Sequence, residues 1–166
     1  MSDHIHVYVG YSGAGGAVYQ SDGTAYAFFS EQIDKPFLLT AMGSGQHTMI
    51  QELEMLALLI AAELWCPSSE GRRVVAFSDS ESVRGSFLKG WSSNDPSSQV
   101  LRRILLLEER YSSHIWLERV PSQSNPSDLL SRSRVARWSG FQQTRVNPRE
   151  IWDHAANSIE IGRAHV

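Results

Sequence analysis

Apolar and polar positions along the first thirty residues predict three short strands. Residues 4–9 alternate between polar and apolar side chains, the period of a half-buried strand. Residues 17–20 and 24–29 are strand-like runs on either side of an Asp-Gly turn at 21–23, which is a strong hairpin signal. We therefore expect three successive antiparallel strands. The glycine-rich residues 12–16 are expected to form a loop between the first two.

The rest of the chain alternates between helical and strand-like patterns. Residues 48–65 are rich in helix formers and apolar on nearly every side, which predicts a buried helix. Residues 74–78 and 114–120 predict two further strands. Three more segments are predicted to be helical, namely residues 80–89, 94–111 and 125–138. A β-hairpin start followed by helical crossovers predicts an α/β fold with a mixed five-stranded sheet flanked by helices.

Composition is that of an ordinary globular chain. The 166 residues fit one domain, with 42% hydrophobic and 20% charged residues. No stretch approaches the ~20 apolar residues of a membrane span, so we expect no membrane partner. The first residues lack the basic and apolar regions of a secretory signal, and Cys66 is the single cysteine. We therefore expect an intracellular protein, cytoplasmic or nuclear.

Charge is distributed unevenly along the chain. Residues 1–100 carry five Lys and Arg against eleven Asp and Glu, whereas residues 101–166 carry ten Arg against seven acids. Such a division is compatible with a metal site beside a phosphate-contacting surface, and equally with an ordinary solvated surface. Five arginines are candidates for phosphate contacts, with Trp138 or Phe141 alongside: Arg102, Arg103, Arg132, Arg134 and Arg137.

Three carboxylates stand at comparable places on separate elements. Glu54 lies in the apolar helix, Asp79 follows the fourth strand, and Asp128 lies in the first turn of the last helix. Buried carboxylates are costly without a positive partner, and an oxygen-only ligand set suits Mg²⁺ or Mn²⁺. Each acid also has a simpler interpretation. Asp79 or Ser80 could cap the next helix, Glu54 could lie on an exposed edge, and Asp128 could be an ordinary N-terminal acid.

Taken together, these segments resemble the ribonuclease H domain of retroelement reverse transcriptases. The segments are 53–57 (LEMLA), 77–83 (FSDSESV) with 88–93 (LKGWSS), and 117–132 (LERVPSQSNPSDLLSR), and the resemblance extends over about residues 5–134. The last segment is the most specific part.

The resemblance implies a known activity. Members of the family hydrolyse the RNA strand of RNA–DNA hybrids with two Mg²⁺ (or Mn²⁺) ions held by four carboxylates. It implies that Glu54, Asp79 and Asp128 are the second, third and fourth catalytic and metal-binding acids. It further implies an upstream reverse transcriptase domain as a partner. Four residues are implied to bind substrate: Ser12, Ser80, Asn125 and Arg132.

The first acid of the family pattern is missing. Gly10 stands where the opening strand should end in Asp, and neither Asp3 nor Asp22 offers a clear substitute. Because the missing Asp contacts both metals in the family, its loss should lower metal binding and rate together. Three hypotheses follow: an impaired metal-dependent endonuclease, a catalytically inactive nucleic-acid-binding or structural module of the same fold, and an unrelated α/β protein whose acids only cap helices.

We expect three divisions of the chain. Residues 1–134 would form the ribonuclease H-like domain, and residues 135–159 a C-terminal extension of unknown role. Residues 160–166 lack periodicity and match what a sequencing-library adapter would encode, so they carry no functional argument.

Overall fold

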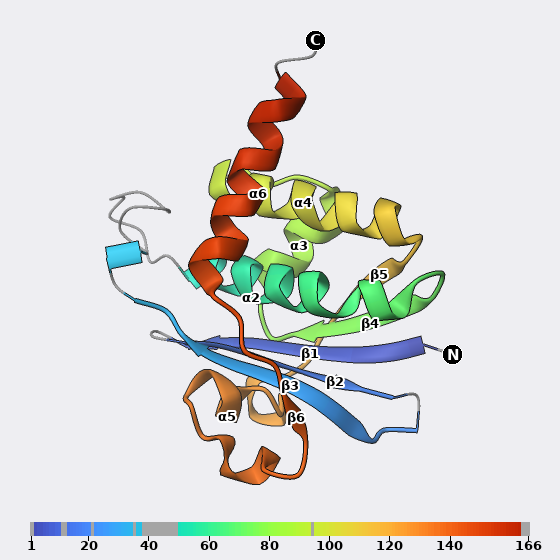
Figure 1. The fold of residues 1–166 in the computed structure, drawn as a ribbon, viewed down its shortest axis with the longest axis vertical. Coiled ribbons are helices and arrows are strands. Elements are labelled where there is room, and N and C mark those ends of the chain that lie inside the picture. The colour runs from blue at the N-terminus through green and yellow to red at the C-terminus, as the bar shows by residue number, and fades with distance from the viewer. Residues whose placement is uncertain are drawn as a thin grey trace.

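Six strands form one mixed sheet in the order β5-β4-β1-β2-β3-β6 (Figure 1). The structure is a computed structural model that describes residues 2–10, 13–20, 22–34, 36–37, 50–93 and 95–163. The strands are β1 (Ser2–Gly10), β2 (Gly13–Tyr19), β3 (Ala25–Gln32), β4 (Arg73–Ser78), β5 (His114–Arg119) and β6 (Gln142–Gln143). The helices are α2 (Ile50–Trp65), α3 (Glu81–Lys89), α4 (Asp95–Tyr111), α5 (Asp128–Ser131) and α6 (Pro148–Arg163). Three short 3-10 helices are η1 (Pro67–Ser69), η2 (Ser122–Ser124) and η3 (Val135–Trp138).

Strand pairing confirms the predicted mixed sheet. β1, β2 and β3 pair antiparallel in sequence order, whereas β4 lies parallel to β1 and β5 lies parallel to β4. The two-residue strand β6 pairs parallel with β3 and adds a sixth strand to the expected five. The carboxyl ends of β1, β4 and β5 therefore lie at one edge of the sheet, the usual place for a site in such sheets.

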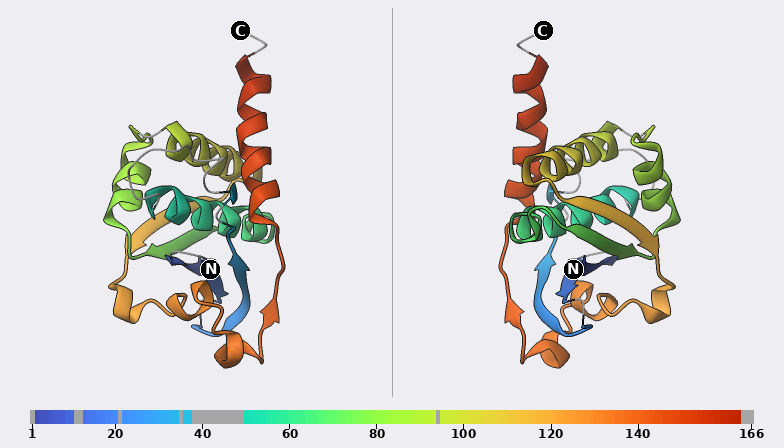
Figure 2. Two further views of the ribbon diagram at one scale, coloured as in Figure 1. Left: turned by 90° about the vertical axis from the view of Figure 1, so that its left-hand side faces the viewer. Right: turned by 90° about the vertical axis from the view of Figure 1, so that its right-hand side faces the viewer.

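Helices cover both faces of the sheet. Helices α2, α3, α4 and α6 lie on one side, and the short α5 with η3 lies on the other (Figures 1 and 2). Helix α2 rests on β1 and β2, α4 packs on α2, and α5 packs on β1, β2 and β3. None of the described helices is long and apolar enough to cross a membrane.

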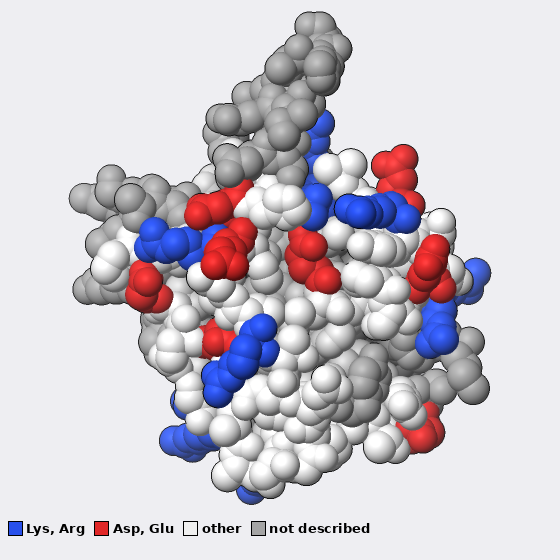
Figure 3. All heavy atoms as spheres, in the orientation of Figure 1, with Lys and Arg blue, Asp and Glu red and all other residues white. Residues whose placement is uncertain are grey.

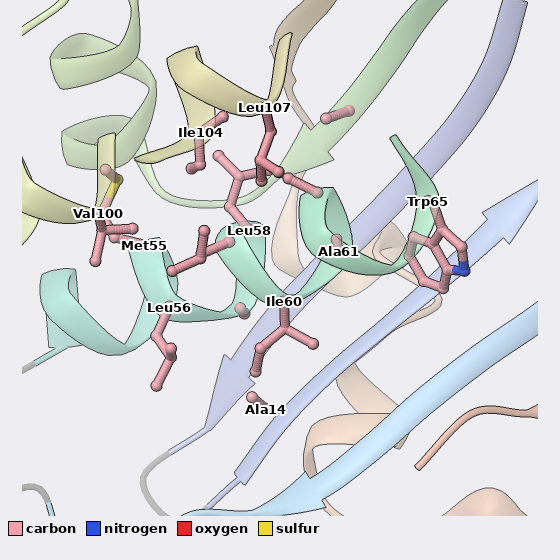
Figure 4. Packing of buried hydrophobic residues seen from close by; sticks show 14 of the residues in the cluster. Ala14, Met55, Leu56, Leu58, Ile60, Ala61, Trp65, Val100, Ile104 and Leu107 are labelled. Atoms are coloured by element: carbon pink, nitrogen blue, oxygen red, sulfur yellow. The ribbon is translucent and has the colours of Figure 1, made fainter. Parts of the chain in front are cut away.

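Helix α2 is the centre of the hydrophobic core, as its apolar pattern predicts. All residues from Met55 to Ala62 are buried. Figure 4 shows Ile60 over Ala14 of β2, while Ile104 and Leu107 of α4 reach toward the opposite side of the helix. Truncating a leucine buried in such a core costs about 2–5 kcal/mol, so α2 is held firmly in place.

The expected loop at residues 12–16 is wrong, because Gly13 to Gly16 lie inside β2. These glycines let α5 approach the strand. A Cβ at Gly13 would clash with the Ser131 carbonyl oxygen, and one at Gly15 would lie 2.5 Å from the Leu130 Cβ. The glycines serve close packing in an extended strand, whereas the sequence pattern predicts a loop.

The expected last helix, residues 125–138, is also shorter in the structure. Helix α5 ends at Ser131, and Ser133 has a positive φ of 57° that breaks the helical path. The N–H of Arg134 donates to the carbonyl of Leu129 at 2.8 Å, which closes this end. Helix η3 then begins at Val135.

Residues beyond 134 contribute to the fold. Trp138 packs on Phe28 of β3 with a centroid distance of 5.7 Å. Trp152 of α6 is buried, and its ring packs against that of Phe37 with a centroid distance of 6.5 Å. The packing thus continues across residue 134, where the domain boundary was expected.

Arg103 is a structural residue, and it does not offer a phosphate contact. Its Nε donates to Oε1 of Glu63 at 2.7 Å, joining α4 to α2, and only 11% of the Arg103 side chain is exposed. Arg102, its neighbour, is exposed. The two adjacent arginines therefore lie on different faces of α4.

The close packing of α5 on β2 predicts that Gly15→Ala destabilises the protein. Its Cβ would meet the backbone and Cβ of Leu130, and overpacking of this kind costs about 1–3 kcal/mol. Gly85→Ala is the matched control, because a Cβ there meets nothing within 4 Å in the middle of α3. It should stabilise by about 0.5–1 kcal/mol. Urea unfolding of both variants measures the difference, and equal stabilities would contradict the packing account.

Candidate functional site

Asp79 lies where β4 meets α3, directly after the last strand residue, Ser78. Of the two candidates for the helix cap, Ser80 is the one used. Its Oγ accepts a hydrogen bond from the backbone N–H of Val83 at 3.3 Å, and its own N–H donates to Ser78 Oγ at 3.2 Å. The carboxylate of Asp79 takes no part in the cap, so it is available for other interactions.

The parallel pairing of β4 and β5 positions a hydroxyl beside Asp79. The N–H of Val120 donates to the carbonyl of Ser78 at 3.0 Å, which carries the pairing past the end of β5. Ser122 follows at the start of η2, and its Oγ donates to Oδ2 of Asp79 at 2.7 Å. This hydrogen bond orients the carboxylate and leaves its other oxygen open to a second partner.

Glu54 of α2 is the neighbour of Asp79 across the corner between helix and sheet. Its side chain is half-buried, so the alternative of an exposed helix edge does not hold. Burial raises the pKa of Glu54 above its ordinary value of 4.5; a hydrogen bond from the Ser80 side chain lowers it in part, and the negative charge of Asp79 raises it further. The sheet and α2 therefore bring two of the three predicted acids together.

Glu54 and Asp79 lie together without a salt-bridge partner among the described residues. No salt bridge in the described part of the chain involves either residue; Arg84 and Arg119 both pair with Glu81 instead, at 3.4 and 3.6 Å. Two carboxylates without a counter-ion form an oxygen-only donor set, which suits Mg²⁺ or Mn²⁺ better than a softer metal. Since Mg²⁺ often binds proteins through one or two carboxylates and keeps several waters, the residues present fit one such ion.

Asp128 does not join this pair in the structure. It begins α5 on the opposite face of the sheet, and its Oδ1 accepts a hydrogen bond from Nε of Arg132 at 3.0 Å. Among the described residues, no group of three His, Cys, Asp or Glu side chains lies close enough together to hold a metal. The expected cluster of three acids is thus only partly assembled.

The position of the missing acid lies at the same edge of the sheet. Gly10 is the last residue of β1 and pairs with Gly13 of β2. Because β1 runs parallel to β4, its end extends toward the edge where Asp79 lies. Gly13 in turn packs against Ser131 of α5, so Gly10 also lies close to the helix that carries Asp128.

The four residues implied to bind substrate have different surroundings. Ser80 caps α3. Asn125 is buried, and its Oδ1 accepts a hydrogen bond from the N–H of Ser127 at 3.1 Å, so it shapes the turn before α5. Arg132 is exposed and pairs with Asp128. Ser12 lies outside the described residues.

A polar groove that sequence reasoning did not identify is lined in part by Gln51 of α2 and Glu81 of α3. It has a volume of about 380 Å³ between the start of α2 and the end of α3. Its lining includes Gln51, Ser82, Ser86, Lys89, Trp91 and Ser92. Gln51 Nε2 donates to Ser86 Oγ and to Ser92 Oγ, each at 3.3 Å. Lys89 and Trp91 are both exposed, so the groove offers a cation and an aromatic face.

Comparisons with known proteins identify the fold. No family model and no curated protein sequence matches the chain. Among solved structures, RNase H1 from the halophilic archaeon Halobacterium salinarum matches with a TM-score of 0.61 and 19% identity, covering 82% of this chain and 99% of that one. The N-terminal RNase H domain of rv2228c from Mycobacterium tuberculosis matches with a TM-score of 0.61 and 18% identity, covering 80% and 98%.

A third structure was solved with a nucleic acid. LC11-RNase H1 in complex with an RNA/DNA hybrid matches with a TM-score of 0.61 and 14% identity, covering 80% of this chain and 94% of that one. The chain therefore has the ribonuclease H-like α/β fold, as the resemblance of its sequence motifs implies.

The partly buried position of Glu54 predicts a specific pH dependence of stability. Its folded-state pKa is raised, so the unfolded chain loses this proton first as the pH rises above about 4.5. The contribution of Glu54 to the free energy of unfolding is therefore lost as the pH rises from about 4.5 through the folded-state pKa. Glu54→Gln should remove that loss and be more stable than the wild type at pH 7.

The measurement is the free energy of unfolding from pH 4 to pH 8, in EDTA so that no divalent ion contributes. Glu109→Gln, at an exposed position of α4, is the matched control and should keep the wild-type profile. If the free energy of unfolding depends on pH in the same way for the wild type and for Glu54→Gln, then folding does not raise the pKa of Glu54.

Proposed function

We propose that this chain binds RNA–DNA hybrids and hydrolyses their RNA strand with Mg²⁺ or Mn²⁺, as part of a retroelement reverse transcriptase and at a reduced rate. The observation that carries the proposal is the Glu54–Asp79 pair at the edge of a ribonuclease H-like sheet, two carboxylates that form no salt bridge within the described part of the chain. The segment from residue 117 to residue 132 supports the retroelement origin, since it is the most specific part of the resemblance.

Each residue of the pair has a partner that prepares it for a metal. Ser122 orients Asp79 through one oxygen, and the Ser80 hydroxyl holds Glu54. Bound at these carboxylates, a divalent cation would supply Lewis-acid stabilisation of the charge that develops on the scissile phosphate. Lys89 and Trp91 of the polar groove would contact the sugar-phosphate backbone of the hybrid, with Lys89 facing phosphate.

Asp128 and Gly10 account for the reduced rate. Asp128 is kept in the proposal as the third acid, and it would exchange its Arg132 partner for the metal when the hybrid binds. Gly10 brings no carboxylate to the edge where the first acid belongs. With fewer ligands, binding of the second ion that the family uses should be weak.

Further parts of the proposal concern the surroundings of the domain. The partner in the parent polyprotein would be an upstream reverse transcriptase domain, and the location would be intracellular. Ser12, Ser80, Asn125 and Arg132 remain the proposed substrate contacts, with Asn125 acting by shaping the turn before α5.

A catalytically inactive hybrid-binding module is the second candidate. Two observations favour it: Gly10 in place of the first acid, and the ion pair that occupies Asp128. Both candidates keep the polar groove as the nucleic-acid surface, so they differ only in cleavage.

The two candidates are separated by restoring the missing acid. We expect slow cleavage of an RNA–DNA hybrid by the wild type in Mg²⁺, and cleavage about 100-fold faster or more for Gly10→Asp; no cleavage by the wild type would favour the inactive module. A lost ligand should matter at least as much as an outer-shell partner, whose loss costs about 10–100-fold. A gel assay with labelled RNA measures the rates.

The double variant Gly10→Asp with Asp79→Asn is the control, and it should be inactive while still binding the hybrid. If Gly10→Asp stays inert although the protein binds Mg²⁺, the metal assignment is wrong. If the wild type cleaves as fast as Gly10→Asp, another group replaces the first acid.

A further inference from the structure

A second hollow lies on the other face of the sheet, away from the polar groove. It has a volume of about 470 Å³, within the range of pockets that hold small ligands. The hollow is formed where the β2–β3 hairpin tip faces the segment that carries α5 and η3. Six residues that supply most of its apolar lining are Tyr19, Ala25, Pro126, Leu129, Trp138 and Phe141.

Its walls contain three aromatic rings in contact. Trp138 lies edge-on to Tyr19 at 6.2 Å and to Phe141 at 5.6 Å between ring centroids. Trp138 is 7% exposed, whereas Phe141 is 37% exposed, so the Phe141 ring offers its surface to an incoming group. The N–H of Phe141 donates to the Trp138 carbonyl at 2.9 Å, which holds the two residues in a fixed arrangement.

The charge around the hollow favours a ligand with an anionic group. Arg137 is the one charged side chain among the described residues that line it, and it is exposed. Burial raises the pKa of Tyr19 to about 12, so its phenol stays neutral at physiological pH and adds no negative charge. In Figure 3 the surface over α5 and β6 is largely free of charged groups, without a large acidic patch.

We propose that this aromatic pocket binds an unpaired nucleobase of a single strand that extends from the hybrid, with Arg137 on the adjacent phosphate. The inference rests on the proposed function and names a further part of its substrate. Aromatic faces bind bases of any sequence by stacking, and a single arginine supplies the phosphate contact. A wholly apolar ligand would leave Arg137 without a role.

The pocket adjoins the short segment that carries Asp128. Pro126 and Leu129 line it, and Asp128 lies between them in the sequence at the start of α5. A strand that leaves the hybrid beside Asp128 therefore needs to pass only this segment to reach the aromatic rings.

The test compares a blunt RNA–DNA hybrid with four hybrids that each carry a four-nucleotide extension on one of the four ends. Fluorescence anisotropy in EDTA measures binding without cleavage. At least one extension should tighten binding roughly tenfold, the scale of stacking one base on an aromatic side chain. An abasic extension of the same length should give no such gain, because only its phosphates remain.

Variants test whether the gain in affinity from the extension comes from the pocket. Phe141→Ala and Arg137→Gln should each return the extended hybrid to the affinity of the blunt one, and Phe141→Trp should keep the gain. Arg137→Gln changes an exposed residue, so it serves if Phe141→Ala fails to fold. Arg110→Gln and Leu105→Ala, exposed on α4 across the sheet, are the matched controls and should leave both affinities unchanged.

Several outcomes would overturn the inference. These are the absence of any gain from all four extensions, an equal gain from the abasic extension, and a gain that persists in both Phe141→Ala and Arg137→Gln. If the blunt hybrid is not bound at all, the proposed function fails. Binding of an oligothymidylate that depends on Phe141 would then still support the pocket. If the oligothymidylate does not bind either, the inference about the pocket is overturned as well.

Discussion

The burial of the Glu54 carboxylate beside the carboxylate of Asp79 is the constraint on which this account depends. Glu54 and Asp79 come from a core helix and a strand end, and neither has a cationic partner in the described residues. Isolated charges of like sign are costly at low dielectric, so a fold that keeps them together gains from a bound cation. In the proposed function, this local cost would link the stability of the protein to metal binding.

The architecture explains why this corner persists. Helix α2 is fixed by apolar contacts with the sheet below and with α4 above, so Glu54 cannot easily turn toward water (Figure 4). On the other face, the glycines of β2 let α5 lie against the strand, which sets Asp128 and the aromatic pocket beneath the same sheet. One sheet thus carries an acidic corner on its edge and an apolar hollow on its far side.

Much of the fold could be predicted from the sequence because its strongest elements are periodic. The long apolar helix, the strand before Asp79 and the hairpin with its Asp-Gly turn all follow from local patterns. Gly13 and Gly15 were misassigned because the reason for them, the approach of Leu130 and Ser131, lies more than a hundred residues away. The ion pair of Asp128 with Arg132 was missed for a similar reason, since a motif names a residue without showing which partner its side chain takes. The aromatic pocket could not be predicted from the sequence, because it forms only where the hairpin tip meets η3 in the folded protein.

The most direct test of the central claim is an NMR titration of the Glu54 side-chain carboxyl, with and without Mg²⁺, in the wild type and in Asp79→Asn. The account predicts a pKa above the ordinary value without the metal, because burial and the charge of Asp79 both raise it. That pKa should fall when Mg²⁺ is added to the wild type, and the metal should have little effect in Asp79→Asn. A pKa for Glu54 that neither Asp79→Asn nor Mg²⁺ changes would contradict the claim that the two carboxylates form a metal site.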